Sequence, residues 1–305
     1  MTIISLKKFE SSEGNVWKYV FHIPNGITES VLYRYESFEK RTVLCCSVQS
    51  GCPVGCIFCG TGRHFIRNLS SDEIIEQIDY VFKDSSIDTF NVRKLQIMFM
   101  SMGEPFLNYD SVEPAIRKLH SKYPNAQLLV STIVPRNESV LNKFIALSKE
   151  IPKIGLQFSI HKSSDEERDN SIPFKNKLAL EEIALYGRKW FLATGRRPYC
   201  NYCVDGKNDS ENDFKNLTSL FDPTVFCFTF SVVCAKDETM KDNAFRNLSV
   251  VDTFSRRFID AGYDTRIFDP AGQDDIGGGC GQLWYVQKYL TEKHRVYDEA
   301  WGGMK

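Results

Sequence analysis

Long apolar runs are missing from this sequence. No segment approaches the roughly 18 to 20 consecutive apolar residues that a membrane-spanning helix requires, so we expect no membrane span. The first residues, MTIISLKKFESSEG, also lack the basic-then-apolar pattern of a secretory signal. We therefore expect a cytoplasmic protein.

An excess of charge of one sign is missing as well. The 38 basic and 39 acidic side chains give a net charge of −1, whereas nucleic-acid binding usually depends on Lys and Arg contacts to phosphate. Any RNA site must therefore be a local patch, and Arg196, Arg197 and Lys207, which flank a predicted strand end, suggest one at the barrel mouth. No Pro- or Ser-rich linker divides the chain, which favours one catalytic domain.

Cysteine, in contrast, is abundant. Ten cysteines without an export signal favour metal binding or thiol chemistry over a disulfide framework, because cytosolic thiols stay reduced. Cys52, Cys56 and Cys59 stand in the run CPVGCIFC, just past a predicted strand, where one loop can bring three thiolates to a [4Fe–4S] cluster. A zinc knuckle completed by a distant ligand, or a set of buried free thiols, is the alternative.

Apolar strand-like runs alternate with amphipathic helical stretches through most of the chain. The predicted strands are VLCCSV, LQIMFMSM, AQLLVST, IGLQFSI, PYCNYCV and VFCFTFSVV. About six such βα units indicate an α/β fold, a partial (β/α)6 open barrel with ligands at the carboxyl ends of its strands. We expect a short N-terminal β-hairpin extension in residues 1–40, the barrel core in 41–290 and a C-terminal tail in 291–305.

A cluster with only three protein ligands leaves one iron open to a small molecule. This arrangement resembles the radical S-adenosylmethionine (SAM) superfamily, whose open iron binds SAM, and it implies a barrel of the radical-SAM type. Polar groups at successive strand ends fit this resemblance: Gly103 and Glu104 of a GEP run, Ser131, and the run Ser159, Ile160 and His161. We expect these residues to bind SAM.

The wider sequence resembles the RlmN/Cfr family of radical-SAM RNA methyltransferases. The segments that carry the resemblance are LCCSVQSGCPVGCIFCGTG, NLSSDEIIEQI, MSMGEPFLNYDSV, STIVP, SIHKSSDEERDNSIPFKNK, YCVDGKNDS and DDIGGGCGQL. They follow the family's order from about residue 15 to 290. Cys280 matches the family's methyl-carrying cysteine, Cys45 matches its second catalytic cysteine, and Glu29 resembles its proposed proton acceptor.

The resemblance implies a mechanism. One SAM methylates Cys280, and a second SAM yields a 5′-deoxyadenosyl radical that takes hydrogen from the S-methyl group. The methylene radical adds to an adenine ring carbon, C2 in preference to C8, and Cys45 helps to resolve the protein–RNA adduct, which leaves a Cys45–Cys280 disulfide to be reduced. The implied partners are a ribosomal or transfer RNA substrate and an external electron donor such as a flavodoxin-type reductant. We expect a monomer.

Two departures from the family pattern limit what the resemblance implies. The usual SAM-contacting Asn is absent from PTVFCFTFSVVCAKD, where Ser231 is the expected substitute. The usual N-terminal accessory domain is expected to be lacking, because the predicted hairpin begins within the first twenty residues. Two alternatives therefore stay open: a radical-SAM enzyme of the same scaffold with another substrate, and a non-catalytic iron–sulfur protein.

Overall fold

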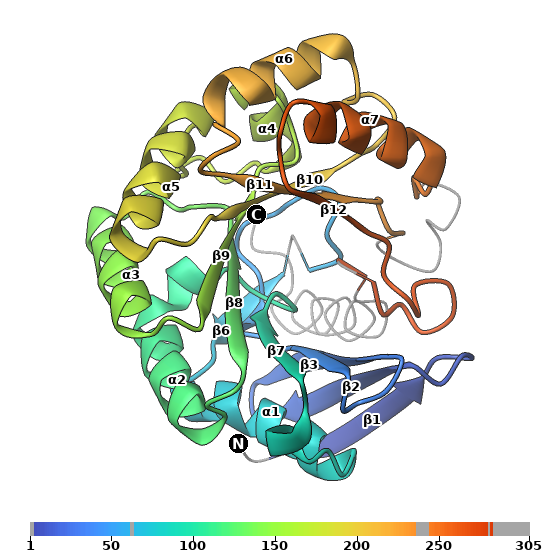
Figure 1. Ribbon diagram of the computed structural model, residues 1–305. Helices are drawn as coiled ribbons and strands as arrows, with labels where there is room; N and C mark the ends of the chain where they lie inside the picture. The colour runs from blue at the N-terminus through green and yellow to red at the C-terminus, as the bar shows by residue number, and fades with distance from the viewer. Residues whose placement is uncertain (1–2, 62–63, 236–243, 280, 283–305) are drawn as a thin grey trace, which may run out of the picture.

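The computed structural model in Figure 1 describes residues 3–61, 64–235, 244–279 and 281–282. A ten-stranded sheet, in the order β1-β2-β3-β4-β7-β8-β9-β10-β11-β12, curls into an open barrel with helices along its outer side. Its strands are β1 (Ser5–Glu10), β2 (Val16–Ile23), β3 (Gly26–Tyr35), β4 (Arg41–Cys45), β7 (Lys94–Phe99), β8 (Gln127–Thr132), β9 (Ile154–Ser159), β10 (Tyr199–Cys203), β11 (Cys227–Ser231) and β12 (Thr265–Phe268). The predicted partial barrel is confirmed.

Pairing is parallel from β4 to β12 and antiparallel from β1 to β4. The predicted hairpin is formed by β2 and β3, and β1 adds a third strand at the edge of the same sheet. The extension is therefore continuous with the barrel wall. Its side chains can reach the barrel interior.

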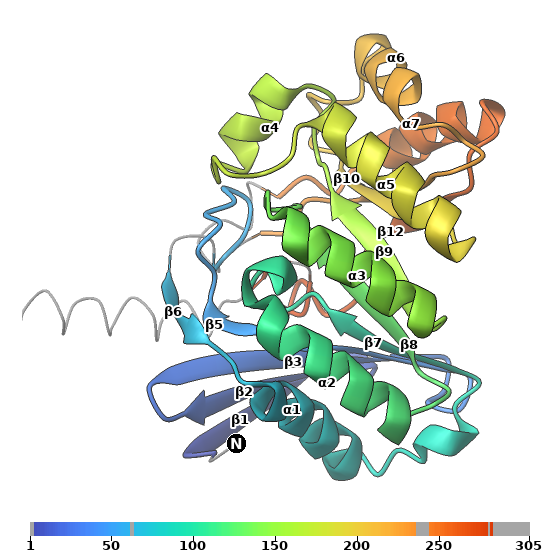
Figure 2. The ribbon, with the colours of Figure 1, turned by 90° about the vertical axis from the view of Figure 1, so that its left-hand side faces the viewer.

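Helices cover the outer face of the parallel strands, as the side view in Figure 2 shows. They are α1 (Ser71–Asp84), α2 (Tyr109–Lys122), α3 (Glu138–Glu150), α4 (Asp165–Ser171), α5 (Leu180–Thr194), α6 (Glu211–Leu220) and α7 (Leu248–Asp260), with 3-10 turns η1 (Thr89–Asn91) and η2 (Pro105–Asn108). The main core lies between these helices and the sheet. In the described part of the chain, no helix is both long and apolar enough to cross a membrane.

A short two-stranded ladder stands apart from the main sheet. Its strands, β5 (Gln49–Gly51) and β6 (Phe65–Asn68), are antiparallel and bracket the segment that holds the CPVGCIFC run. The Cys52 N–H donates to the carbonyl of His64 across the base of this segment, at 2.8 Å. The ladder thereby closes the loop, and its cysteines line a pocket together with Ser131 and Ser159 at the carboxyl ends of β8 and β9.

Candidate functional site

The cysteine loop is held from two sides. The Ile57 N–H donates to the carbonyl of Ser171 at the end of α4, at 3.1 Å, and the Gly60 N–H donates to the carbonyl of Gly281 at 2.8 Å. Gly281 directly follows Cys280, which itself lies outside the described residues. The residue that follows the predicted methyl carrier therefore lies next to the predicted cluster loop.

The three loop thiols are neighbours in one pocket, which Cys52, Cys56 and Cys59 line together. Burial raises the pKa of Cys52 to about 12 and that of Cys56 well above its usual value, and the nearby Cys59 raises both further. Buried thiols this close to one another hold negative charge favourably only around a bound cation. Three cysteine thiolates from one loop are a donor set that fits a [4Fe–4S] cluster. Among the described residues, no group of three or more His, Cys, Asp or Glu is placed to hold a single metal ion.

The strand ends supply polar groups to the same pocket. Ser131 on β8 and Ser159 on β9 both line it, and their hydroxyl oxygens are 3.2 Å apart. Gln157, two residues before Ser159 on β9, also lines the pocket. Its Nε2 donates to the Ser131 hydroxyl at 3.2 Å. The sequence predicted both serines and missed Gln157, which shares their face of the sheet because side chains alternate along a strand.

Glu104 lies at the edge of the pocket with most of its hydrogen-bonding capacity used within the protein. Its carboxylate accepts from the Phe106 N–H at 3.0 Å, the Thr132 hydroxyl at 2.6 Å and the Ile133 N–H at 2.9 Å. A carboxylate has about four acceptor positions, so one is left for a ligand. Burial raises the pKa of Glu104 to about 7.

Gly103 is required by its surroundings. Its φ of +101° is in the region that favours glycine, and an added Cβ would lie 2.7 Å from Cβ of Gln49. Gln49 in turn accepts from the Glu104 N–H through Oε1, at 2.9 Å. Gly103 therefore allows the close approach that fixes the backbone of Glu104.

We expect Gly103→Ala to destabilise the protein more than Gly195→Ala does. Gly195 also has a positive φ, +70°, but an added Cβ there has no atom within 4 Å. The control thus carries the cost of the backbone conformation alone, about 1 kcal/mol, whereas Gly103→Ala adds the clash with Gln49. Urea unfolding of the two variants measures the difference, and equal losses would show that Gln49 moves aside freely.

His161 joins the cysteine loop to the strand ends. It has a φ of +59°, its Nδ1 accepts from the Cys203 N–H at 3.2 Å, and its ring packs edge-on against Phe58 with centroids 4.8 Å apart. Burial lowers the pKa of His161 to about 3, so the ring is neutral. Ile160, also expected at the site, has its side chain in the main core instead of the pocket wall.

Ser231 is next to the pocket but does not line it. Asn201 and Cys203 of β10 line the pocket, whereas Ser231 is not among the lining residues and donates to Oδ1 of Asn201 at 3.1 Å. The polar amide that reaches the pocket in this region therefore comes from β10, one strand earlier than the sequence suggested. Asn201 is therefore a further candidate for a SAM contact beside Ser231, whose hydroxyl donates to it.

Lys18 and Glu29 form an ion pair inside the protein, with Nζ 2.9 Å from Oε1 and both side chains at 1% exposure or less. Lys18 Nζ also donates to the carbonyls of Gly277, at 2.9 Å, and Gln282, at 3.0 Å. The ammonium group of Lys18 thus has two carbonyl acceptors and one carboxylate counter-charge. One buried cation therefore holds the chain on both sides of Cys280.

The proton affinity of Glu29 is set by two opposing effects. Burial raises the pKa of Glu29 to about 7, and the positive charge of Lys18 lowers it from what burial alone would give. Burial also lowers the pKa of Lys18, and the Glu29 carboxylate opposes that change. A carboxylate with a pKa near neutrality suits a proton acceptor, the role predicted for Glu29.

Cys45 shares a face of the sheet with this pair. Across the strands Lys18 is opposite Val31, Val31 is opposite Cys45, and Glu29 lies two residues before Val31 on the same face. Burial raises the pKa of Cys45 to about 12, so its sulfur is protonated at neutral pH. Cys45 also packs in a small apolar cluster with Ile276, which begins the glycine-rich segment before Cys280.

Arg168 is a buried cation that sequence reasoning missed. It is 1% exposed and donates to the carbonyls of Ile133 and Leu178, each at 2.8 Å. Burial lowers the pKa of Arg168 to about 10, and the nearby carboxylates of Asp165 and Asp169 oppose that change. The only signal was its place in the DEERDN run, within a segment that resembles the family.

Comparisons with known proteins agree with this geometry. No protein-family model matches the chain. A probable dual-specificity RNA methyltransferase RlmN from Pseudothermotoga lettingae is 31% identical over 282 residues, covering 91% of this chain and 78% of that protein. Another from Thermotoga petrophila is 32% identical over 285 residues, with coverage of 91% and 78%.

Solved structures show the same fold. A radical SAM methyltransferase from Sphaerobacter thermophilus superimposes with a TM-score of 0.78 at 26% identity, over 92% of this chain and 81% of that one. Streptococcus suis SuiB, at 11% identity and a TM-score of 0.52 over 75% and 49% of the two chains, shares the fold alone. On the strength of the sequence relatives and the methyltransferase structure, this chain belongs to the RlmN family of radical SAM RNA methyltransferases.

Proposed function

We propose that this protein methylates a ring carbon of adenine, C2 in preference to C8, in ribosomal or transfer RNA, with Cys280 as the methyl carrier. The observation that carries the proposal is the hydrogen bond from Gly60, next to Cys59, to Gly281, next to Cys280. It supports a methyl-carrying thiol that works beside the cluster loop. The relatives are named dual-specificity RNA methyltransferases, so we extend the proposal to more than one RNA.

The cofactors supply the radical chemistry. A [4Fe–4S] cluster held by Cys52, Cys56 and Cys59 would, with bound SAM, provide the 5′-deoxyadenosyl radical. Around it the chain offers hydroxyl and amide groups from Ser131, Ser159 and Asn201, which can orient SAM at the strand ends. An external flavodoxin-type reductant acting on a monomer completes the proposal.

The protein's own groups handle thiols and protons. We assign Glu29 as the proton acceptor, with a pKa matched to neutral pH, and Lys18 as the positioning residue that fixes both Glu29 and the flanks of Cys280. Cys45, on the same face, is the second thiol. Its high pKa keeps it from reacting until a base removes its proton.

Mass spectrometry of RNA nucleosides tests the function. Cells that carry the gene should contain 2-methyladenosine that cells without it lack, and purified Cys280→Ala protein should keep its cluster while losing methyl transfer. If 8-methyladenosine is the only new product, the methylated carbon is C8 and not C2. If anaerobically reconstituted enzyme forms 5′-deoxyadenosine and no adenine is methylated, the substrate is another molecule; if no 5′-deoxyadenosine forms, the protein is a non-catalytic member.

A further inference from the structure

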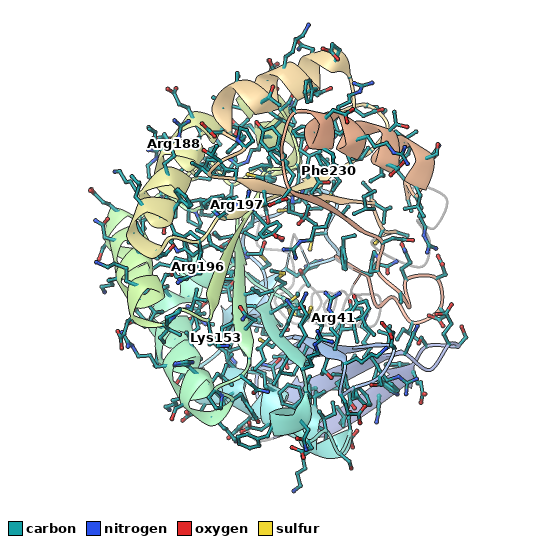
Figure 3. The ribbon with its side chains drawn as sticks, viewed as in Figure 1. Arg41, Lys153, Arg188, Arg196, Arg197 and Phe230 are labelled. Atoms are coloured by element: carbon teal, nitrogen blue, oxygen red, sulfur yellow. The ribbon has the colours of Figure 1, made fainter. Side chains whose placement is uncertain are left out.

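Basic side chains gather at the end of the barrel opposite the cysteine loop. Arg41 begins β4, Lys94 begins β7, Lys153 precedes β9, and Arg266 lies in β12. Because neighbouring parallel strands begin at the same edge of a sheet, these residues come together at the amino-terminal end of the barrel. Figure 3 looks onto this end, with Arg41 and Lys153 labelled on the viewer's side.

All of these cations except Arg41 line a cavity of about 370 Å³, within the size range of small-molecule sites. Arg93, Lys94, Lys153 and Arg266 line it, with amide groups from Gln96 and Gln127 among the other lining residues. No Asp or Glu is among the described residues that line it. The protein as a whole has a net charge of −1, so this cavity is a local concentration of positive charge.

The cations are crowded without compensation. Arg41 and Arg266, from distant strands, are both close enough to lower the pKa of Lys94 by repulsion, in addition to the effect of burial. Among the ion pairs of the described residues, none involves Arg41, Lys94 or Arg266. Unpaired like charges at close range cost free energy that a bound anion recovers.

Two of the guanidinium groups are held in place by aromatic rings. Arg266 lies over Tyr199, 3.7 Å from the ring centroid, and Arg41 lies over Tyr35 at 4.3 Å. Arg41 Nε also donates to Oε1 of Gln96 at 3.2 Å. These contacts restrict both side chains before any ligand arrives, which lowers the entropy lost on binding.

Nearby arginines outside the cavity already form ion pairs or hydrogen bonds within the protein. Arg197 pairs with Asp264, Arg196 donates to the carbonyl of Ser148 at 2.5 Å, and Arg188 donates to the carbonyl of Leu220 at 2.9 Å. Arg196 and Arg197 precede β10, at this end of the barrel and not at the mouth where the sequence suggested a basic rim. Of the basic residues named at this end, those without such partners line the cavity or adjoin it, and this compact arrangement favours a compact anion over an extended polymer.

We propose that this cavity is a second ligand site, which binds a compact phosphate-bearing anion such as pyrophosphate or the polyphosphate of a nucleotide. The fork of a guanidinium matches phosphate oxygens in pairs, and the lysines add point charges. Met100 and Gln157 line both this cavity and the pocket at the other end of the barrel. A ligand here would therefore border two side chains that also line the cofactor pocket.

Calorimetric titration of the cluster-reconstituted protein with inorganic pyrophosphate tests the proposal without depending on turnover. We expect saturable binding that weakens as salt rises, and at least a tenfold loss of affinity in Arg266→Gln and in Lys94→Gln. Arg256→Gln is the control, because it removes the same charge from α7, where Arg256 pairs with Asp252 at 2.7 Å. Its affinity should match that of the original protein.

A second titration with a short RNA distinguishes the source of the phosphate. If pyrophosphate displaces the RNA and both variants lose RNA affinity, the phosphate belongs to the RNA backbone. If pyrophosphate binds and RNA affinity is unchanged in the variants, the ligand is a free phosphate compound. Absence of saturable pyrophosphate binding, or equal weakening in the Arg256→Gln control, would overturn the proposal.

Discussion

Replacing Lys18 with methionine is expected to lower methyl transfer at least about a hundredfold while leaving the cluster in place. The change removes two charge-assisted hydrogen bonds, to Gly277 and Gln282, each worth about 1.5–3 kcal/mol. It also leaves Glu29 buried without its counter-charge. An increase of about 2.7 kcal/mol in the activation free energy corresponds to a hundredfold decrease in rate.

The pH profile separates this role from a loss of structure. Activity of the original protein should rise with pH through about 7, as Glu29 loses its proton and becomes able to accept one. Because the charge of Lys18 lowers the pKa of Glu29, its removal should shift that rise to higher pH. A Lys18→Met profile that is weaker but unshifted would show that Lys18 supports the fold only.

Two further variants serve as controls that distinguish a loss of function from misfolding. Lys8→Met makes the same substitution on the neighbouring strand β1, where Lys8 pairs with Asp84 near the surface at 2.6 Å, and should keep near-normal activity. Adding Glu29→Gln to Lys18→Met removes both buried charges, which should recover stability without recovering activity. Cluster absorbance and the urea unfolding midpoint report folding for all of these variants.

The parallel strands could be predicted because their buried residues form continuous or alternating apolar runs in the sequence. In β11 every residue is buried, and in β8 and β9 burial alternates. The strand β12, in contrast, has four residues of which two are exposed, so its sequence TRIF carries no pattern. The helix α4 likewise carries no apolar pattern, since its buried residues are Arg168 and Ser171.

The residues of the candidate site also differ in whether a local sequence pattern could predict them. Cys52, Cys56 and Cys59 are local in the chain, so their spacing alone could indicate a shared ligand. Lys18 and Gly277 are 259 residues apart, and no local pattern predicts a contact between them. Ser231 is opposite Cys203 in the register of β10 with β11 and so shares the face of Asn201, but only Asn201 lines the pocket, a difference that no sequence pattern predicts.

The neighbouring cysteines Cys45 and Cys46 offer the sharpest test of the proposed thiol chemistry. Cys45 lies on the face that carries Lys18 and Glu29, whereas Cys46 is buried in the main core. Loss of a side chain that takes part in proton transfer or nucleophilic chemistry commonly costs about 10²–10⁴ in rate. We expect a loss of that size for Cys45→Ala, together with accumulation of RNA covalently attached to the protein.

Cys46→Ala should instead lower stability by about 1 kcal/mol and leave turnover unchanged below its unfolding temperature, because it removes only a packed sulfur. Denaturing electrophoresis and intact-protein mass spectrometry would detect the adduct in one variant and its absence in the other. The two positions are adjacent in the chain but lie on different faces. If both variants lose activity and form the adduct, the cause is a disturbed structure at the end of β4. An adduct confined to Cys45→Ala would show that the sheet face with the buried ion pair is where the protein–RNA bond is broken.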